Sequence, residues 1–213
     1  SQFRCNGSKG YIAWVDDVLQ IRETANADGF DLDFDLRVCD SPEALHAAIE
    51  EKNRQTRTSR VVAGYCWEWE KDGRANPEVT DIKIGEYERS WNLDDSDPWA
   101  ITEGSIDQVG CIHTCQGLEF DYVGVIIGED LTYRDGEIVV DHEERASTDR
   151  SLFGIKKMFD ETPTQAAEIA EELIKNTYRT LMTRGMDGCY LYCCDEKLQA
   201  YLKTRIENVS LSG

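Results

Sequence analysis

The chain has 213 residues, of which 40% are hydrophobic, and this length is enough to bury a substantial core in one large domain or two small ones. It carries 42 acidic residues against 23 basic ones, for a formal net charge of −19. That balance argues against a surface that binds a phosphate backbone unaided, because such binding needs a local surplus of Lys and Arg. Any nucleic-acid role must therefore be local or shared with a partner.

The eight cysteines include no C-x-x-C pair, so the usual zinc spacing is absent. Cys66, Cys111 and Cys189 lie in apolar, strand-like runs, where cysteine behaves as a small hydrophobic residue. We therefore expect reduced core thiols in a cytoplasmic protein. No signal peptide and no apolar run long enough to span a membrane is visible. The sequence opens on SQFRCN, and we expect a fragment of a longer protein.

The first half of the chain alternates helical and strand patterns. Apolar residues recur at helical spacing over 8–22, and the alternating stretch DLDFDLRVCD that follows is typical of a half-buried strand. Ser41-Pro42 supplies a cap and a first-turn proline for a helix to about residue 53. SRVVAGYCW (59–67) predicts a buried strand, residues 68–80 read as a loop, and residues 81–91 indicate further strand.

Two strand-like runs, VGCIH and DYVGVIIG, flank the polar centre of the stretch GCIHTCQGLEFDYVG (110–124). Asp135-Gly136 then stands between two β-rich runs, which is the signature of a hairpin. Residues 141–150 are highly charged, and we expect them to be mobile. The hairpin and these charged residues together form a predicted insertion, 129–150.

The last part of the chain is mainly helical. A short helix over 151–159 precedes Thr162-Pro-Thr-Gln, which matches a capping box at the start of a long amphipathic helix. Gly185 is expected to cap the end of that helix. GCYLYC (188–193) predicts a buried strand, and Asp195 is expected to cap a last helix.

Short apolar strands between amphipathic helices predict an α/β sandwich with a mainly parallel sheet. We expect the sheet to include residues 61–66, 108–113, 121–127 and 188–193. No G-x-x-x-x-G-K-[ST] motif occurs, so the chain lacks a P-loop of its own, and no H-E-x-x-H or H-x-x-E-H metal motif is present.

Polar residues gather between the strands of the 110–124 stretch. Ligands in open α/β sheets bind at the carboxyl ends of strands. The stretch therefore places four side chains where binding groups belong, namely His113, Thr114, Gln116 and Glu119. From spacing alone, a turn with a capping Glu is the favoured interpretation. A Cys115–His113 nucleophile pair is discounted, because residues two apart point to opposite faces of a strand.

Arginines stand near two helix ends. Arg179 and Arg184 lie at the end of the long helix in NTYRTLMTRGMDGCYLYC (176–193), and Arg4 lies in QFRC (2–5), just before the first helix. Arginine at a helix C-terminus can simply complement the helix dipole. The functional alternative is a guanidinium aimed at an anion, as in an arginine finger.

QFRC, CIHTCQGLEFD and NTYRTLMTRG occur in the order of the late motifs of superfamily 1 helicases. The chain resembles the second RecA-like domain of that superfamily. In finer detail it is similar to the Schlafen group-3-like DNA/RNA helicase domain, a largely uncharacterised bacterial family, and this match covers nearly the whole chain. SRVVAGYCW, GSIDQVGCIHTCQGLEFDYVGVIIG and NTYRTLMTRGMDGCYLYC carry the closer likeness. The resemblance implies a three-layer RecA-like fold of P-loop NTPase type over 1–213.

The resemblance implies nucleotide-side roles for several residues. Arg4 matches an Arg that touches the γ-phosphate, and Arg184 matches the arginine finger. Glu119 matches a Glu near the nucleotide sugar. Three further residues fall in the same nucleotide-binding motifs, namely Gly117, Gln116 and Gln2. The resemblance also implies that ATP and Mg²⁺ are bound mainly by a preceding RecA-like domain, so this chain alone is predicted to be inactive as an ATPase.

His113 and Thr114 match positions on the nucleic-acid side of the same loop. The stretch thereby resembles a coupling element that senses nucleotide on one side and a strand of DNA or RNA on the other. Many relatives have Ser-Lys where this chain has Cys115-Gln116, which removes a positive charge from the loop.

Three functions follow as hypotheses. The leading one is the C-terminal motor domain of an ATP-dependent helicase or translocase. The second is a nucleotide-dependent switch ATPase that acts on a protein partner without unwinding. A degenerate structural domain is disfavoured, because Arg4, Glu119 and Arg184 all stand at matching places. A basic groove near His113 would favour the first hypothesis over the second.

Overall fold

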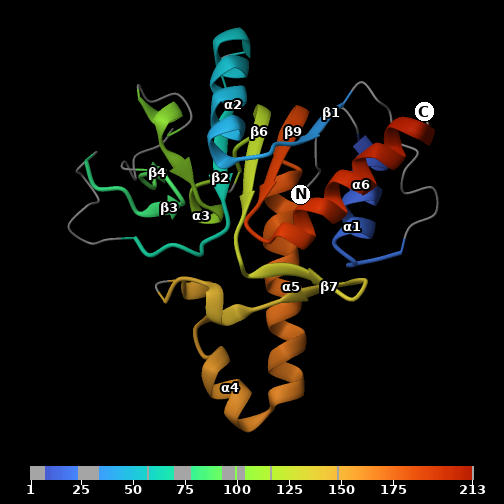
Figure 1. Ribbon diagram of the computed structural model, residues 1–213. Helices are drawn as coiled ribbons and strands as arrows, with labels where there is room; N and C mark the ends of the chain where they lie inside the picture. The colour runs from blue at the N-terminus through green and yellow to red at the C-terminus, as the bar shows by residue number, and fades with distance from the viewer. Residues whose placement is uncertain are drawn as a thin grey trace.

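The computed structural model describes residues 8–23, 34–56, 58–69, 78–92, 99, 104–115, 117–147 and 149–212. It is an α/β domain with a parallel central sheet and helices on both faces, in three layers (Figure 1). This confirms the predicted fold class, and the layering is consistent with a RecA-like domain. Within the described part of the chain, no helix combines the length and the apolar character needed to cross a membrane.

The central sheet has five strands in the order β1-β9-β6-β2-β5, and every neighbouring pair is parallel. The strands are β1 (Asp35–Val38), β9 (Gly185–Cys193), β6 (Phe120–Ile127), β2 (Arg60–Ala63) and β5 (Val109–Gly110). All four apolar runs predicted to share a sheet do so. The central strands β6 and β9 are the longest and are buried along most of their length.

Three helices cover one face of the sheet: α1 (Ser8–Val18), α5 (Pro163–Met182) and α6 (Glu196–Ser212). Val123, Val125 and Leu191 point into their hydrophobic cluster, as alternate residues of a strand must. The helix α1 runs antiparallel to α5, because Asp16 pairs with Arg179 while Tyr11, nearer the start of α1, donates to the carbonyl oxygen of Met182 at 2.7 Å.

The other face is covered by α2 (Pro42–Thr56) and by the two-stranded sheet β3 (Ile82–Ile84) and β4 (Tyr87–Arg89). The predicted cap of α2 forms, since the Ala44 amide donates to Ser41 Oγ at 3.0 Å. Gly124 in β6 lets α2 approach closely: a Cβ there would stand 2.7 Å from Ile49 Cγ1.

The strands β7 (Leu131–Arg134) and β8 (Glu137–Val140) form the predicted hairpin, with Asp135 and Gly136 at positive φ as a type I′ turn requires. Two short 3₁₀ turns, η4 (His142–Glu144) and η5 (Arg150–Leu152), lead to α4 (Ile155–Glu161). In Figure 1 the hairpin and α4 lie together beyond the carboxyl edge of the sheet. Within the charged segment 141–150, the Arg145 side chain is only 2% exposed and is held by ion pairs.

Several predicted helix ends differ from the observed ones. The first helix ends at Val18 rather than residue 22, and Gln20 beyond it has a positive φ of 57°. The capping box does not form, because Thr162 directly follows α4 and its hydroxyl donates to Met158 in that helix. Gly185 begins β9 instead of capping α5. A Cβ at Gly185 would lie 2.1 Å from the Gly188 carbonyl oxygen, so glycine is required by the irregular start of the strand.

Candidate functional site

The stretch between β5 and β6 is more compact than the sequence predicted. The strand β5 ends at Gly110, and residues Ile112–Cys115 form one helical turn, α3, where a strand to residue 113 was expected. The Cys115 amide donates to the Cys111 carbonyl oxygen at 3.1 Å. Gly117 follows with φ of 78°, in the left-handed region that favours glycine, so the chain can turn tightly at this residue.

The two ends of this stretch lie at opposite edges of the sheet. His113 follows the carboxyl end of β5, whereas Glu119 precedes the amino end of β6. Because β5 and β6 both run parallel to β2, the chain between them must return across the sheet before β6 can begin. The placement of Glu119 at the carboxyl edge is therefore wrong, and that of His113 is confirmed.

Glu119 and Arg184 come together at the amino edge. The amide of Phe120, next to Glu119, donates to the Arg184 carbonyl oxygen at 2.9 Å. Arg184 also lies near Cys115: burial raises the pKa of the Cys115 thiol, and the positive charge of Arg184 partly offsets that rise. The fold thus joins the end of the 110–124 stretch to the junction of α5 and β9, which are far apart in the sequence.

The side chain of Arg184 has an unused donor. Among the described residues, its Nε atom is buried and lacks a hydrogen-bond partner. Leaving such a donor unsatisfied costs roughly 1–3 kcal/mol, and more for a charged group. A buried guanidinium nitrogen in this state fits an anionic group that is bound only when the site is assembled.

Arg179, the other arginine of this helix end, has a different role. Its Nε lies 2.5 Å from Asp16 Oδ1, and the pair fastens α5 to α1. The start of α1 is held near Arg184, because Tyr11 bonds to Met182. Arg4 and Gln2, which precede α1, lie outside the described residues, as do Gln116 and the side chain of Thr114.

His113 lies at the carboxyl edge with its side chain half exposed. Its Nε2 atom stands 3.6 Å from Asp149 Oδ1, and its ring meets the edge of Tyr65 with centroids 6.3 Å apart. The nearest charged group is thus a carboxylate. The sequence predicted that His113 and Glu119 belong to one binding loop. In the structure, His113 lies at the carboxyl ends of the strands and Glu119 at their amino ends.

A buried ionic cluster lies next to His113 and includes Asp149. Arg145 Nη1 lies 3.0 Å from Asp130 Oδ2, and Arg145 Nη2 lies 2.6 Å from Asp149 Oδ2. Tyr178 of α5 donates its hydroxyl to Asp130, and the Gly128 amide donates to Tyr178 Oη at 3.0 Å. Both carboxylate side chains are fully buried.

The electrostatics of this cluster follow from its pairing. Burial favours the neutral form of both Asp149 and Arg145, but the opposing effects are stronger. Attraction to Asp130 and Asp149 raises the pKa of Arg145, and Arg145 together with hydrogen bonds from Ser151 lowers the pKa of Asp149. The cluster could not be predicted from the sequence, because Asp130 and Tyr178 are distant from Arg145 in the chain. The four-residue spacing of Arg145 and Asp149 was the only local signal.

Within the described ranges, no group of three or more His, Cys, Asp or Glu side chains is placed to hold a metal ion. The seven cysteines described are free thiols. Among the described residues, Arg184 thus keeps a buried donor without a partner, and its carbonyl oxygen is hydrogen-bonded to the stretch that carries His113.

Comparison with known proteins places the chain in a family. Residues 1–195 match the family described as Schlafen group 3, DNA/RNA helicase domain. A curated relative, Uncharacterized protein YPL245W of Saccharomyces cerevisiae (strain ATCC 204508 / S288c), is 28% identical over 217 residues, which cover 94% of this chain and 46% of the relative. The chain thus spans about half the length of that relative, and similar chains are not confined to bacteria. Because the family match extends over most of the sequence, the chain belongs to the Schlafen group 3 DNA/RNA helicase domain family.

Proposed function

We propose that this chain is the C-terminal motor domain of an ATP-dependent helicase or translocase. Its part in the reaction is to present Arg184 to the phosphates of ATP held mainly by a separate, preceding RecA-like domain. The observation that carries the proposal is the buried Nε of Arg184, which has no hydrogen-bond partner among the described residues. That the yeast relative is about twice as long as this chain is compatible with such a second domain.

Arginine suits this task because its planar guanidinium donates two parallel hydrogen bonds to phosphate oxygens and stays charged. Bound ATP with Mg²⁺ supplies the phosphoryl group, on whose oxygens negative charge is rearranged as the leaving bond breaks. The chain itself contains no P-loop. Arg184, together with Arg4 from the segment before α1, would add positive charge from the opposite side of the nucleotide. Glu119 would contact the sugar. The same nucleotide-binding motifs include Gly117, Gln116 and Gln2.

Coupling to nucleic acid would run through the 110–124 stretch. A change in the position of Arg184 acts directly on Phe120 through their 2.9 Å backbone hydrogen bond. The opposite end of the stretch carries His113 and Thr114, which would face the DNA or RNA strand. The stretch that contains α3 and Gly117 connects the two ends of the strands, and a displacement at one end would be passed to the other along it.

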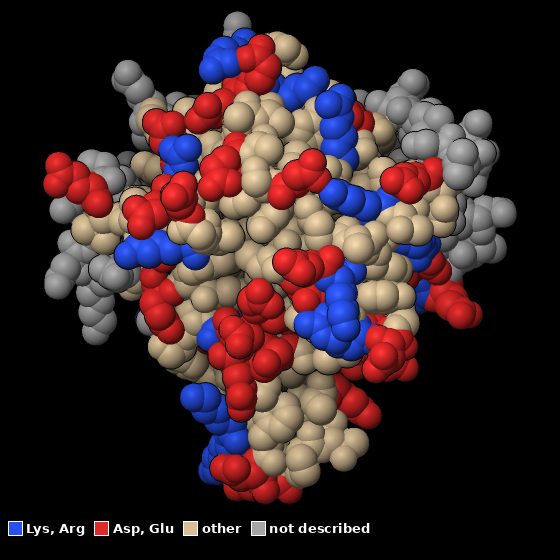
Figure 2. Space-filling model, in the orientation of Figure 1, with Lys and Arg blue, Asp and Glu red and all other residues tan. Residues whose placement is uncertain are grey.

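A nucleotide-dependent switch that acts on a protein partner is the second candidate. It is favoured by the net charge of −19 and by the carboxylate of Asp149 that faces His113. Figure 2 shows acidic and basic side chains intermixed on the visible face, without a continuous basic band. An ATPase rate that does not respond to DNA or RNA would support this candidate over a motor.

Steady-state kinetics of the full-length protein test the proposal. Arg184→Ala should lower kcat by roughly 10³–10⁵-fold with little change in ATP binding, as the loss of an arginine finger does. Arg184→Lys should restore little, because an ammonium lacks the planar fork.

Arg179→Ala is the matched control, since it lies on the same helix end but pairs with Asp16. It should melt earlier while turnover at permissive temperature stays near wild type. If Arg184→Ala melts slightly earlier yet hydrolyses ATP at the wild-type rate, Arg184 only complements the helix dipole, worth about 0.3–1 kcal/mol, and the proposal is wrong.

A further inference from the structure

A short basic segment stands out against the acidic chain. Residues 150–157 read RSLFGIKK, with three cations and no acidic residue, in a protein of net charge −19. The segment comprises η5 and the first turn of α4. Within the described part of the chain, Arg150, Lys156 and Lys157 take part in no ion pair, so their charges are available to a ligand. Figure 2 shows basic side chains, with acidic ones beside them, at the end of the molecule where Figure 1 places α4.

Phe153 lies in the middle of this segment and is 69% exposed. The other exposed large apolar side chains of the described residues, Val139 and Ile169, are 41% and 39% exposed. Gly154, with φ of 85°, turns the chain directly after Phe153 into α4. The turn and the burial of Ile155 fix the segment, so the exposure of Phe153 is built into the fold.

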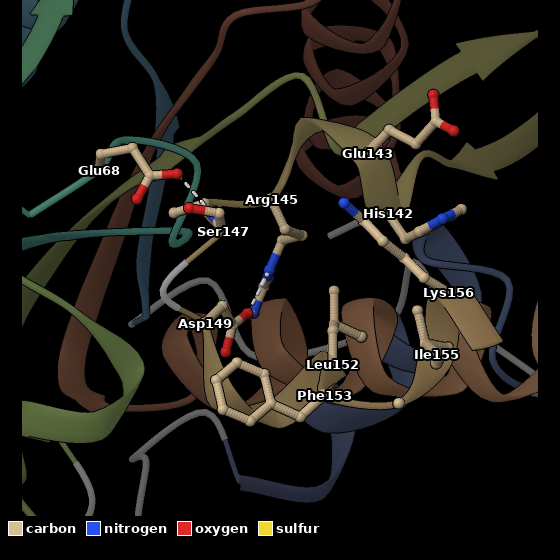
Figure 3. Close-up of a pocket in the computed structure, with 12 residues that line it drawn as sticks. Glu68, His142, Glu143, Arg145, Ser147, Asp149, Leu152, Phe153, Ile155 and Lys156 are labelled. Carbon is tan, nitrogen blue, oxygen red and sulfur yellow. Dashed lines mark hydrogen bonds and ion pairs between the residues drawn. The ribbon is translucent and has the colours of Figure 1, made fainter. Parts of the chain in front are cut away.

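Phe153 lines a cavity of about 510 Å³ between the 142–147 turn and the start of α4 (Figure 3). Leu152 and Ile155 add an apolar floor, and Lys156 extends along the cavity. The cavity adjoins His113, since Asp149 in its wall stands 3.6 Å from the His113 ring. The basic segment and the strand-facing end of the 110–124 stretch thus share the carboxyl edge of the sheet.

Acidic groups also line this cavity, and their charges must be weighed. Asp149 lies 2.6 Å from Arg145, which it shares with Asp130, so this buried cluster keeps one net negative charge. Glu68 accepts a hydrogen bond from the Ser147 amide at 2.5 Å, which keeps it on the wall opposite Phe153. Glu143 extends away from Phe153 in Figure 3. The positive charge near Phe153 therefore comes from Arg150, Lys156 and Lys157 of the segment itself, and the other charged groups of the lining are acidic or already paired.

We propose that the segment 150–157 is a binding site for single-stranded nucleic acid. One unstacked base lies against the ring of Phe153, and the flanking phosphates meet Arg150 and Lys156. An exposed aromatic side chain among unpaired cations is the arrangement that holds single strands without reading their sequence. The inference rests on the proposed motor function, and it supplies the local basic surface that the acidic composition otherwise lacks.

The test is equilibrium binding of fluorescein-labelled dT20 and U20 to the full-length protein without nucleotide, followed by fluorescence anisotropy. Phe153→Ala should bind about 5- to 150-fold more weakly, the range for loss of one base–aromatic stack. Phe153→Trp should keep the affinity and report stacking by a change in its fluorescence. Val139→Ala, which shortens an exposed apolar side chain in β8, is the matched control and should bind like wild type.

The cations are tested through salt dependence. Lys156→Ala should reduce the slope of log K against log [salt] by about 0.7, the value for one phosphate contact on a single strand, whereas Lys83→Ala, exposed on β3, should leave the slope unchanged. Because Phe153 is exposed, none of these variants is expected to alter folding, and thermal melts check this.

Arg184→Ala should bind both oligonucleotides like wild type, so failure of the nucleotide site and failure of this site are separable. Wild-type binding by Phe153→Ala would overturn the inference and leave the Arg184 kinetics standing. Absence of binding to both oligonucleotides by the wild-type protein would also overturn it. The inference would also be overturned if poly-glutamate competed with the oligonucleotides equally well and this competition depended on Phe153 in the same way. The patch would then be a surface for acidic proteins.

Discussion

Replacing Arg145 with Met should lower the free energy of unfolding by about 3–5 kcal/mol, because it leaves buried carboxylates without their counter-charge. The Arg145 side chain is 2% exposed, and those of Asp130 and Asp149 are fully buried. Methionine fills a similar volume, so the loss measures charge and hydrogen bonding rather than a cavity. The variant also tests whether this cluster anchors the segment 141–161 to the sheet.

The remaining partners of each carboxylate place the expected loss toward the lower end of that range. Asp149 keeps hydrogen bonds from the Ser151 amide at 3.0 Å and from Ser151 Oγ at 2.7 Å. Asp130 keeps the hydroxyl of Tyr178. For a domain of 150–250 residues, each kcal/mol shifts Tm by about 2–4 °C, so 3–5 kcal/mol corresponds to a fall of roughly 6–20 °C.

Urea denaturation and scanning calorimetry measure this loss directly. Arg54→Met is the control, since Arg54 and its partner Glu51 are both exposed, and such surface changes stay within about 0.5 kcal/mol. The triple variant Arg145→Met, Asp130→Asn, Asp149→Asn should recover most of the loss, because no buried charge is then left alone. An Arg145→Met protein within about 1 kcal/mol of wild type would refute the reasoning that Arg145 is the buried counter-charge shared by both carboxylates.

Two further predictions concern packing and pH. Gly64→Ala should lower the free energy of unfolding in a urea melt by about 1–3 kcal/mol, because the added Cβ would stand 1.9 Å from Tyr178 Oη. An unchanged midpoint would contradict this packing. His46 is buried, with Nδ1 2.7 Å from Tyr87 Oη and Nε2 2.7 Å from the Ile106 carbonyl oxygen, and burial lowers its pKa below the ordinary value of about 6.5. The unfolded chain then binds more protons than the folded one, so His46 should lower the free energy of unfolding as pH falls through about 6.5 toward the folded pKa. His46→Gln should remove that part of the pH dependence. Equal slopes of unfolding free energy against pH for both proteins would contradict this prediction.

The sequence by itself determined the layers of the fold. Runs such as 121–127 and 188–193 are too apolar and too short for surface helices, so their burial in a parallel sheet follows from hydrophobic periodicity alone. Asp135-Gly136 determined its hairpin for an equally local reason, since few residues adopt two successive positive φ angles. The family resemblance also came from the sequence, and the match over 1–195 supports it.

The candidate site was only partly predictable, because its geometry depends on how the strands are ordered. Sequence spacing could not tell that the stretch after β5 returns across the sheet, which separates His113 from Glu119 and brings Glu119 beside Arg184. Nor could it find that Arg145 joins Asp130 to Asp149, because a buried ion pair is made by chain segments that meet only in the folded domain. Local periodicity records which side chains are buried, whereas the strand order decides which of them meet, and only the tertiary structure contains that order.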